Sequence, residues 1–243
     1  MRENIVKEYA LKEETETSAK ILKKKEHIIN AALIVFSQEG LNGARMEQIA
    51  EEADISKSNI FYYFQSKEVL YVAVLEKVLS KWLSPLSEIN ANQDPRVALK
   101  TYIEEKYKVS KKSPAASRLY ALEIIQGAPH LMAVLKGPLR SLVREKVAVI
   151  DGWIADNKIK SVSAIHLIFH IWAVTQHYSD FSIQTEAVCN HSLRNKKFAN
   201  EALNTSIQLL VDSLIPWFNM SKVQIPNSKS PNPKIEAFFM SVI

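Results

Sequence analysis

The fold is decided by residues 46–64, which read MEQIAEEADISKSNIFYYF. Apolar residues recur there at helical spacing in two short runs, and Asp54-Ile55-Ser56 interrupts them. The small side chain of Ala50 lets a second helix cross closely, and the apolar Ile55 fills the crossing. Two short helices joined by a turn of about three or four residues form a helix-turn-helix.

The second helix of this motif predicts a DNA-binding surface. In a helix-turn-helix the second helix lies in the major groove and presents its N-terminal residues to base edges. None of those side chains is acidic here, so none would be repelled by phosphates. The candidate residues are Lys57, Ser58, Asn59, Tyr62 and Tyr63. An ordinary corner of two helices with a polar outer face is the alternative interpretation.

The composition limits the class of protein. The chain has 243 residues, 31 Lys+Arg against 26 Asp+Glu, a formal net charge of +5 and 47% hydrophobic residues. These values indicate a globular protein of one large or two small domains. Of only five glycines, Gly40 and Gly43 alone lie close together, which excludes a G-x-G-x-x-G or Walker-type nucleotide loop. So few glycines also argue against a turn-rich β-sandwich.

Two further features concern the compartment. The single cysteine, Cys189, excludes an intrachain disulfide framework and a thiolate-only metal cluster. The longest apolar run, residues 31–36, is too short to cross a membrane, and residues 1–25 lack the apolar core of a signal peptide. We therefore expect a cytoplasmic protein with no membrane partner.

The remainder of the chain predicts an all-α protein. We expect a flexible N-terminal arm over residues 1–22, a helix-turn-helix domain over 23–66, a larger helical domain over 67–218 and a disordered tail over 219–243. A basic cluster lies near the end of the arm: Lys20, Lys23, Lys24 and Lys25.

Individual helices are indicated by apolar periodicity and by helix breakers. The first helix should stop at Gly40, and a long helix should run from 67 to about 83, with Pro85 marking its end. Later helices are expected over 96–111, 115–126, 129–135, 139–156, 162–181 and 196–218.

At this point the chain resembles a known family. The matching motifs are Ala32-Leu33-x-x-Phe36-x-x-x-Gly40, then Met46-x-x-Ile49-Ala50-x-x-Ala53-x-Ile55-Ser56, then Phe61-Tyr62-Tyr63-Phe64-x-Ser66-Lys67-Glu68-x-Leu70. They are similar to the N-terminal domain of TetR-family repressors. The resemblance implies a homodimer that binds a palindromic operator in double-stranded DNA. It also implies that the C-terminal helices form both a small-molecule pocket and the dimer interface, and that ligand releases the DNA.

The resemblance also assigns phosphate contacts. Lys67, at a helix N-terminus, matches the family's phosphate-contacting lysine, where the ammonium and the helix dipole both favour an anion. The family usually has a threonine at the position of Ala44, whose hydroxyl caps the second helix and touches phosphate. Ala44 can do neither, and the adjacent Arg45 is the candidate to replace that contact.

Motifs in the C-terminal part are similar to a branch of this family that regulates pyrimidine utilisation. They include Lys81-Trp82-Leu83-x-Pro85-Leu86, Ser113-Pro114-x-Ala116-Ser117-Arg118-Leu119 and Ile171-Trp172-Ala173-x-Thr175-Gln176-His177-Tyr178. The resemblance implies a pocket for a planar effector such as uracil or thymine. The candidate ligand residues are Trp82, Trp172, Gln176 and Tyr178, because indoles offer flat apolar walls and an amide can donate and accept. Alternatively, both tryptophans are plain core and Gln176 is an interface amide.

Other interpretations stay open. The chain could be a TetR-like regulator with a different effector or with none. His166, His170 and His177 lie on one predicted helix and could hold a metal in a helical metal-binding protein or enzyme. No carboxylate or thiolate lies at ligand spacing near them, so we expect neither a metal site nor a catalytic residue.

Overall fold

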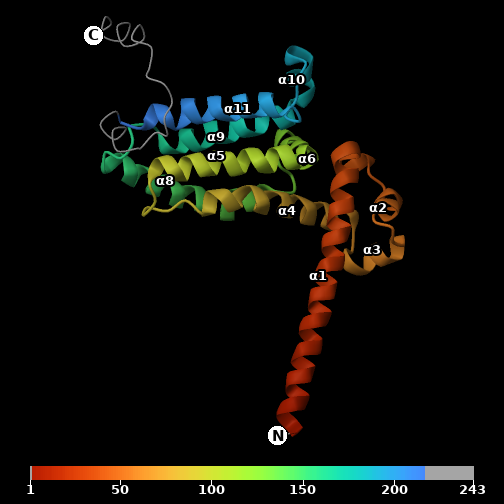
Figure 1. Ribbon diagram of the computed structural model, residues 1–243. Coiled ribbons are helices and arrows are strands. Elements are labelled where there is room, and N and C mark those ends of the chain that lie inside the picture. The colour runs from red at the N-terminus through yellow and green to blue at the C-terminus, as the bar shows by residue number, and fades with distance from the viewer. Residues whose placement is uncertain (1, 217–243) are drawn as a thin grey trace, which may run out of the picture.

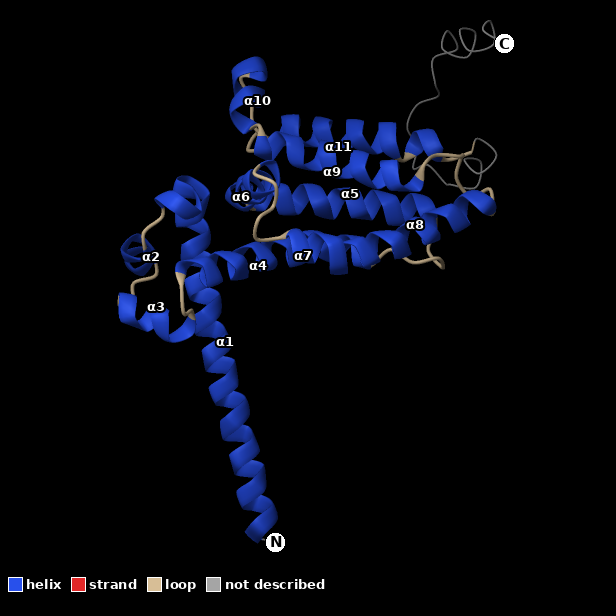
Figure 2. Cartoon of the chain, turned by 180° about the vertical axis from the view of Figure 1, so that it is seen from behind, coloured by secondary structure: helices blue, strands red, loops and turns tan. Residues whose placement is uncertain are grey.

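The computed structural model describes residues 2–216, with side chains placed from residue 19 onward, and every regular element in this range is helical (Figures 1 and 2). The expectation of an all-α protein is therefore confirmed. The chain passes from a small N-terminal head into a longer helical bundle at α4, and both α4 and α6 contact α1 of the head. The expected tail, 219–243, lies outside the described residues. None of the described helices is both long enough and apolar enough to span a bilayer.

The head contains three elements that the sequence predicts well. They are α1 (Arg2–Gly43), α2 (Met46–Glu52) and α3 (Lys57–Tyr63). Helix α1 is interrupted at Gly40, whose φ of 66° is a left-handed conformation that favours glycine. The core of the head is built by buried apolar side chains from all three helices: Ile28, Ala32, Phe36, Ile49 and Ile60.

The beginning of α1 differs from our expectation. Residues 2–22, predicted to be a flexible arm, continue the helix and project beyond the head, away from the bundle (Figures 1 and 2). The sequence there is rich in Glu, Lys, Ala and Leu and contains no glycine or proline. Such a composition has a high intrinsic helix propensity, and this explains the extension.

The bundle begins with α4 (Lys67–Ser87), whose N-cap Ser66 accepts a hydrogen bond from the Val69 amide at 3.2 Å. Pro85 does not end this helix, contrary to prediction. A proline removes one backbone hydrogen bond and its ring crowds the carbonyl four residues earlier, and in the last turn of this well-packed helix that cost is offset by packing. The side chain of Leu86, just after it, is fully buried.

The other helices of the bundle follow the predicted order with altered ends. They are α5 (Pro95–Lys112), α6 (Pro114–Ile125), α7 (Met132–Val134), a π-helical turn η1 (Leu135–Leu139), α8 (Arg140–Ala155), α9 (Ala164–Asp180), α10 (Ser182–Cys189), α11 (Lys196–Leu210) and a 3₁₀ turn η2 (Asp212–Leu214). Helix α10 was not predicted, and the last helix ends at Leu210 rather than at 218.

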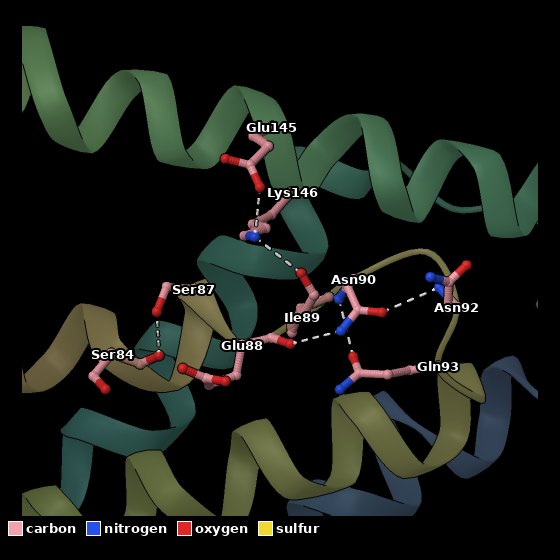
Figure 3. Close-up of polar contacts among 9 residues, drawn as sticks. All are labelled: Ser84, Ser87, Glu88, Ile89, Asn90, Asn92, Gln93, Glu145 and Lys146. Carbon is pink, nitrogen blue, oxygen red and sulfur yellow. Dashed lines mark hydrogen bonds and ion pairs between the residues drawn. The ribbon is translucent and has the colours of Figure 1, made fainter.

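A buried lysine fixes the loop between α4 and α5. The Lys146 ammonium, on α8, donates hydrogen bonds to the Ile89 carbonyl at 2.9 Å and to Glu145 at 2.7 Å (Figure 3). Within the loop, the backbone N–H of Asn90 donates a hydrogen bond to Gln93 Oε1 at 2.9 Å. These hydrogen bonds hold the loop at the end of the bundle that lies far from the head. The candidate DNA-binding and ligand residues lie nearer the head.

Candidate DNA-binding surface and ligand site

Helix α3 is anchored on one side and exposed on the other. Ile60 is fully buried and Phe64 nearly so. The Ser56 hydroxyl caps the helix by accepting a hydrogen bond from the backbone N–H of Asn59 at 3.2 Å. The side chains of Ser58, Asn59 and Tyr62 are exposed. They share one face of α3, because Tyr62 follows Ser58 by four residues and Asn59 by three. This face has the polar chemistry needed to read base edges.

The two tyrosines of α3 differ in their surroundings. Tyr62 is 77% exposed, whereas Tyr63 is half-buried and packs against the core of the head. Their rings meet edge to face with centroids 5.0 Å apart. The Tyr62 side chain is therefore free to contact DNA, whereas the Tyr63 ring also packs in the head.

Two of the predicted DNA-binding lysines are occupied by protein partners: Lys57, expected on the recognition helix, and Lys67, expected to contact phosphate. Lys57 Nζ forms an ion pair with Glu47 Oε1 at 2.5 Å, and this hydrogen bond lowers the pKa of the Glu47 carboxyl. Lys67 Nζ donates to the Ala44 carbonyl at 2.9 Å. Both ammonium groups would have to exchange these partners for phosphate oxygens when DNA binds.

The cap of α2 lies one residue later than the family pattern suggested. The N-cap is Arg45, whose backbone N–H donates to Gln48 Oε1 at 2.9 Å, and Ala44 is buried. A hydroxyl at position 44 is therefore not required to begin this helix. The Arg45 side chain is exposed and available for a phosphate.

Three of the four candidate ligand residues surround one buried lysine. The ammonium of Lys106, on α5, lies 4.6 Å from the ring centroid of Trp82 and 5.9 Å from that of Trp172. It also donates to Gln176 Oε1 at 3.4 Å. Lys106 is only 4% exposed, while Trp172 and Gln176 are half-buried, and these four side chains, from α4, α5 and α9, are called the cage below.

Polar groups complete this cage. Asp180 accepts a hydrogen bond from the hydroxyl of Ser117, on α6, and its charge favours the ammonium form of Lys106. Burial raises the pKa of Asp180 above its ordinary range. The Trp172 indole N–H donates to the Tyr102 hydroxyl at 2.6 Å, which fixes the ring plane.

Sequence reasoning missed Lys106, Ser117 and Asp180 as site residues. A signal for Asp180 was present, since Trp172, Gln176 and Asp180 follow one another at intervals of four and share a face of α9. Lys106 was harder to find, because lysine is almost never fully buried and periodicity arguments place it at the surface.

Tyr178 does not join the cage. It is two residues from Gln176, on the opposite side of α9, and its ring contacts Tyr107 at 5.9 Å and Phe198 at 5.9 Å between centroids. It lines an open groove between α9 and α11 with apolar neighbours that include Val174, Leu209 and Leu210. The structure thus separates Tyr178 from the other three candidates.

The three histidines of α9 do not converge. His166, His170 and His177 are all exposed, and His170 Nδ1 lies 2.7 Å from the His166 carbonyl oxygen. Among the described residues, no group of three His, Cys, Asp or Glu side chains is arranged to hold a metal.

The buried ammonium makes a prediction about pH. Burial lowers the pKa of Lys106 from 10.5 to about 7, although Asp180 raises it in part. Between those values the unfolded chain binds more protons than the folded chain, so the free energy of unfolding rises with pH. From pH 7 to pH 9, wild type should gain about 2 kcal/mol relative to Lys106→Met, as measured by urea unfolding. Equal pH dependence of the two proteins would contradict a buried, titrating Lys106.

A second buried cluster joins the bundle to the head. Glu123, on α6, is 1% exposed and accepts hydrogen bonds from the His130 backbone N–H at 2.7 Å and from the Tyr71 hydroxyl at 3.2 Å. The Tyr71 ring meets Phe36 of α1 edge to face at 5.1 Å. Helix α6 therefore carries Ser117 at the cage and Glu123 at the head.

Two family models match consecutive parts of the chain, and a relative matches most of it. Residues 28–74 match the family described as "Bacterial regulatory proteins, tetR family", and residues 75–216 match "YcdC-like protein, C-terminal region". The HTH-type transcriptional regulator RutR of Escherichia coli O157:H7 is 45% identical over 207 residues, which are 85% of this chain and 98% of the relative.

More distant proteins share parts of the chain or its fold. The HTH-type transcriptional repressor NicS of Pseudomonas putida is 32% identical over 127 residues, which are 52% of this chain and 59% of the relative. The crystal structure of a TetR-like transcriptional regulator from Rhodococcus sp. RHA1 has a TM-score of 0.57 at 17% identity and covers 82% of this chain and 97% of its own.

Proposed function

Because the chain belongs to the TetR family of bacterial transcriptional regulators, we propose that it represses genes of pyrimidine metabolism and leaves its operator when uracil or thymine binds. The regulator class also excludes the enzyme interpretation, since the relatives and the fold are those of transcriptional regulators. The pyrimidine assignment rests on the C-terminal motifs around Trp82 and Trp172 and on the composition of the cage.

The cage of Trp82, Lys106, Trp172 and Gln176 is the observation that carries the ligand proposal. The two indole faces would contact a planar pyrimidine, and the Gln176 amide can both donate to a carbonyl and accept from a ring N–H. The Lys106 ammonium now lies over both rings. The base would take that place between the rings, and the displaced ammonium would donate to one of its carbonyl oxygens.

The operator geometry follows from a two-fold dimer. In the proposed dimer, a second copy of the chain would pack against the groove between α9 and α11, which is lined by Tyr178 and by Leu209, the latter 66% exposed. A symmetric dimer places its two α3 helices in major grooves about 34–36 Å apart or at a wider multiple. A palindromic operator follows from that symmetry.

Helix α6 connects the proposed ligand site in the bundle with the DNA-binding head. Ser117 bonds to Asp180 at the cage, and Glu123 bonds to Tyr71 and to His130 where α4 leaves the head. A ligand that changes the position of Asp180 would shift α6, and α6 would shift the head. Such a ligand releases DNA only by binding one head position more tightly than the other.

A substitution at Glu123 tests this connection. Glu123→Gln keeps the size and the acceptor oxygen but removes the charge that orders Tyr71 and His130. We expect uracil to raise the melting temperature as in wild type, while the uracil concentration that releases half of the operator rises about 2- to 30-fold. Fluorescence anisotropy of labelled operator measures the release. Glu186→Gln, at an exposed residue of α10, is the matched control, and an unchanged release curve for Glu123→Gln would remove α6 from the connection.

The whole proposal is tested by titrating the protein against its own upstream region at several salt concentrations, with and without uracil. Equal affinity for random DNA would contradict sequence-specific regulation. An unchanged melting temperature at millimolar uracil and thymine would remove the pyrimidine assignment, because a ligand that binds the folded state stabilises it. In that case the chain would be a regulator with a different effector or with none.

A further inference from the structure

The first helix carries a stripe of lysines beside the helix-turn-helix. Lys23 and Lys24 follow Lys20 by three and four residues, so all three lie on one face of α1. All three side chains are exposed. These three residues are called the lysine stripe below.

A hydrogen bond shows which way this face points. His27 follows Lys23 by four residues and Lys24 by three, and its Nε2 lies 2.7 Å from the Ala53 carbonyl oxygen. Ala53 is the C-cap of α2, three residues before the N-cap of α3. The stripe therefore lies about one turn before His27 on the face of α1 that meets the turn leading into α3.

The acidic residue of this turn of α1, Glu26, follows Lys23 by three residues but is paired with a lysine of the bundle. Glu26 Oε1 accepts from Lys77 Nζ, on α4, at 2.9 Å, and this contact lowers the pKa of the Glu26 carboxyl. Among side chains 19–216, no carboxylate lies within ion-pair distance of Lys20, Lys23 or Lys24. The stripe thus presents three positive charges to solvent next to the helix that reads DNA.

The helix-turn-helix itself has little positive charge to offer. Residues 44–67 contain Arg45, Lys57 and Lys67 against four acidic residues. The ammonium groups of Lys57 and Lys67 are already held by Glu47 and by the Ala44 carbonyl. Binding to duplex DNA draws most of its sequence-independent free energy from cations on phosphates, so a further source of cations is needed.

We propose that the lysine stripe is a second DNA-contact surface, which binds phosphates of the duplex flanking the bases that α3 reads. This proposal rests on the DNA-binding function proposed above, but its contacts are to phosphate and so are independent of sequence. It predicts that each protomer of the dimer covers more duplex than its half of the inverted repeat.

The test compares wild type with K20Q/K23Q/K24Q on a mixed-sequence duplex over a range of salt concentrations. Removing each lysine–phosphate pair should reduce the slope of log affinity against log salt by about 0.9, and affinity at low salt should fall about tenfold or more. The matched control is K100Q/K158Q/K197Q, which removes the same charge from exposed lysines of the bundle and should change the slope little. Circular dichroism melting verifies that both variants fold.

A second comparison locates the contact. On the operator, trimming the duplex to the inverted repeat should weaken wild type and leave K20Q/K23Q/K24Q almost unaffected. A slope for this variant equal to that of wild type, or equal decreases in affinity for the stripe and control variants, would overturn the proposal. Failure of wild type to prefer operator over random sequence would instead count against the proposed regulatory function, while the mixed-sequence slopes still decide the stripe.

Discussion

Replacing Asn59 and Tyr62 together by alanine is expected to reduce operator affinity by about 10³-fold or more, to the level of random DNA. Both side chains lie on the exposed face of α3, and an asparagine amide can pair with an adenine edge through two hydrogen bonds. Each good pair contributes about 1–3 kcal/mol of discrimination, and a dimer loses it in both half-sites. Competition of labelled operator with random duplex measures the decrease in affinity.

The same variant should bind random DNA almost as wild type does, since it loses no positive charge. Gln65→Ala, at an exposed residue just outside α3, is the control and should leave operator preference intact. Tyr63→Ala is a less clean test than Tyr62→Ala, because Tyr63 also packs against the core of the head. An Asn59/Tyr62 variant that still prefers the operator would show that α3 does not read the bases.

The head could be predicted from sequence because its signals are local. The turn at Asp54-Ile55-Ser56, the N-cap at Ser66 and the interruption at Gly40 all depend on residues close in the chain. Local rules also failed twice: residues 2–22 continue α1 as a helix, and in α4 the rule that proline ends a helix gave way at Pro85 to packing by Leu86 in the same turn.

The cage could be predicted only in part. Trp82, Trp172 and Gln176 were found from their chemistry and from the family resemblance, and the structure brings them together around Lys106. Tyr178 belongs to the same resembling motif as Gln176, but two residues along a helix turn the side chain to the opposite side. Contacts between α5 and α9 depend on packing across some seventy residues of chain, which no local pattern contains.

The cage also explains why the buried charge of Lys106 is tolerated. Burying an isolated ammonium costs several kcal/mol, and here two indole faces, the Gln176 amide and the nearby Asp180 carboxyl offset that cost. Removing one of these partners should leave the Lys106 ammonium without enough favourable contacts to offset its burial. The function of this charge is therefore best tested by replacing the lysine with a side chain of similar volume.

Lys106→Met is expected to weaken uracil binding on the order of 10- to 150-fold while leaving operator affinity without ligand unchanged. The estimate follows from the removal of one hydrogen bond to a charged donor, about 1.5–3 kcal/mol. Isothermal titration calorimetry measures the affinity, and uracil-dependent release of labelled operator measures the response.

A matched control exists in the same domain. Lys146 is also 4% exposed, but its ammonium donates to the Ile89 carbonyl, away from the cage. Lys146→Met should therefore lower the melting temperature without changing uracil affinity, which separates removal of a buried lysine from removal of the ligand contact. Gln176→Ala should weaken uracil binding as well, and the double variant with Lys106→Met should lose less than the sum of the two, because both side chains would touch one ligand. Wild-type uracil affinity in Lys106→Met would place the ligand outside the cage, and the operator response would then have to arise elsewhere in the bundle.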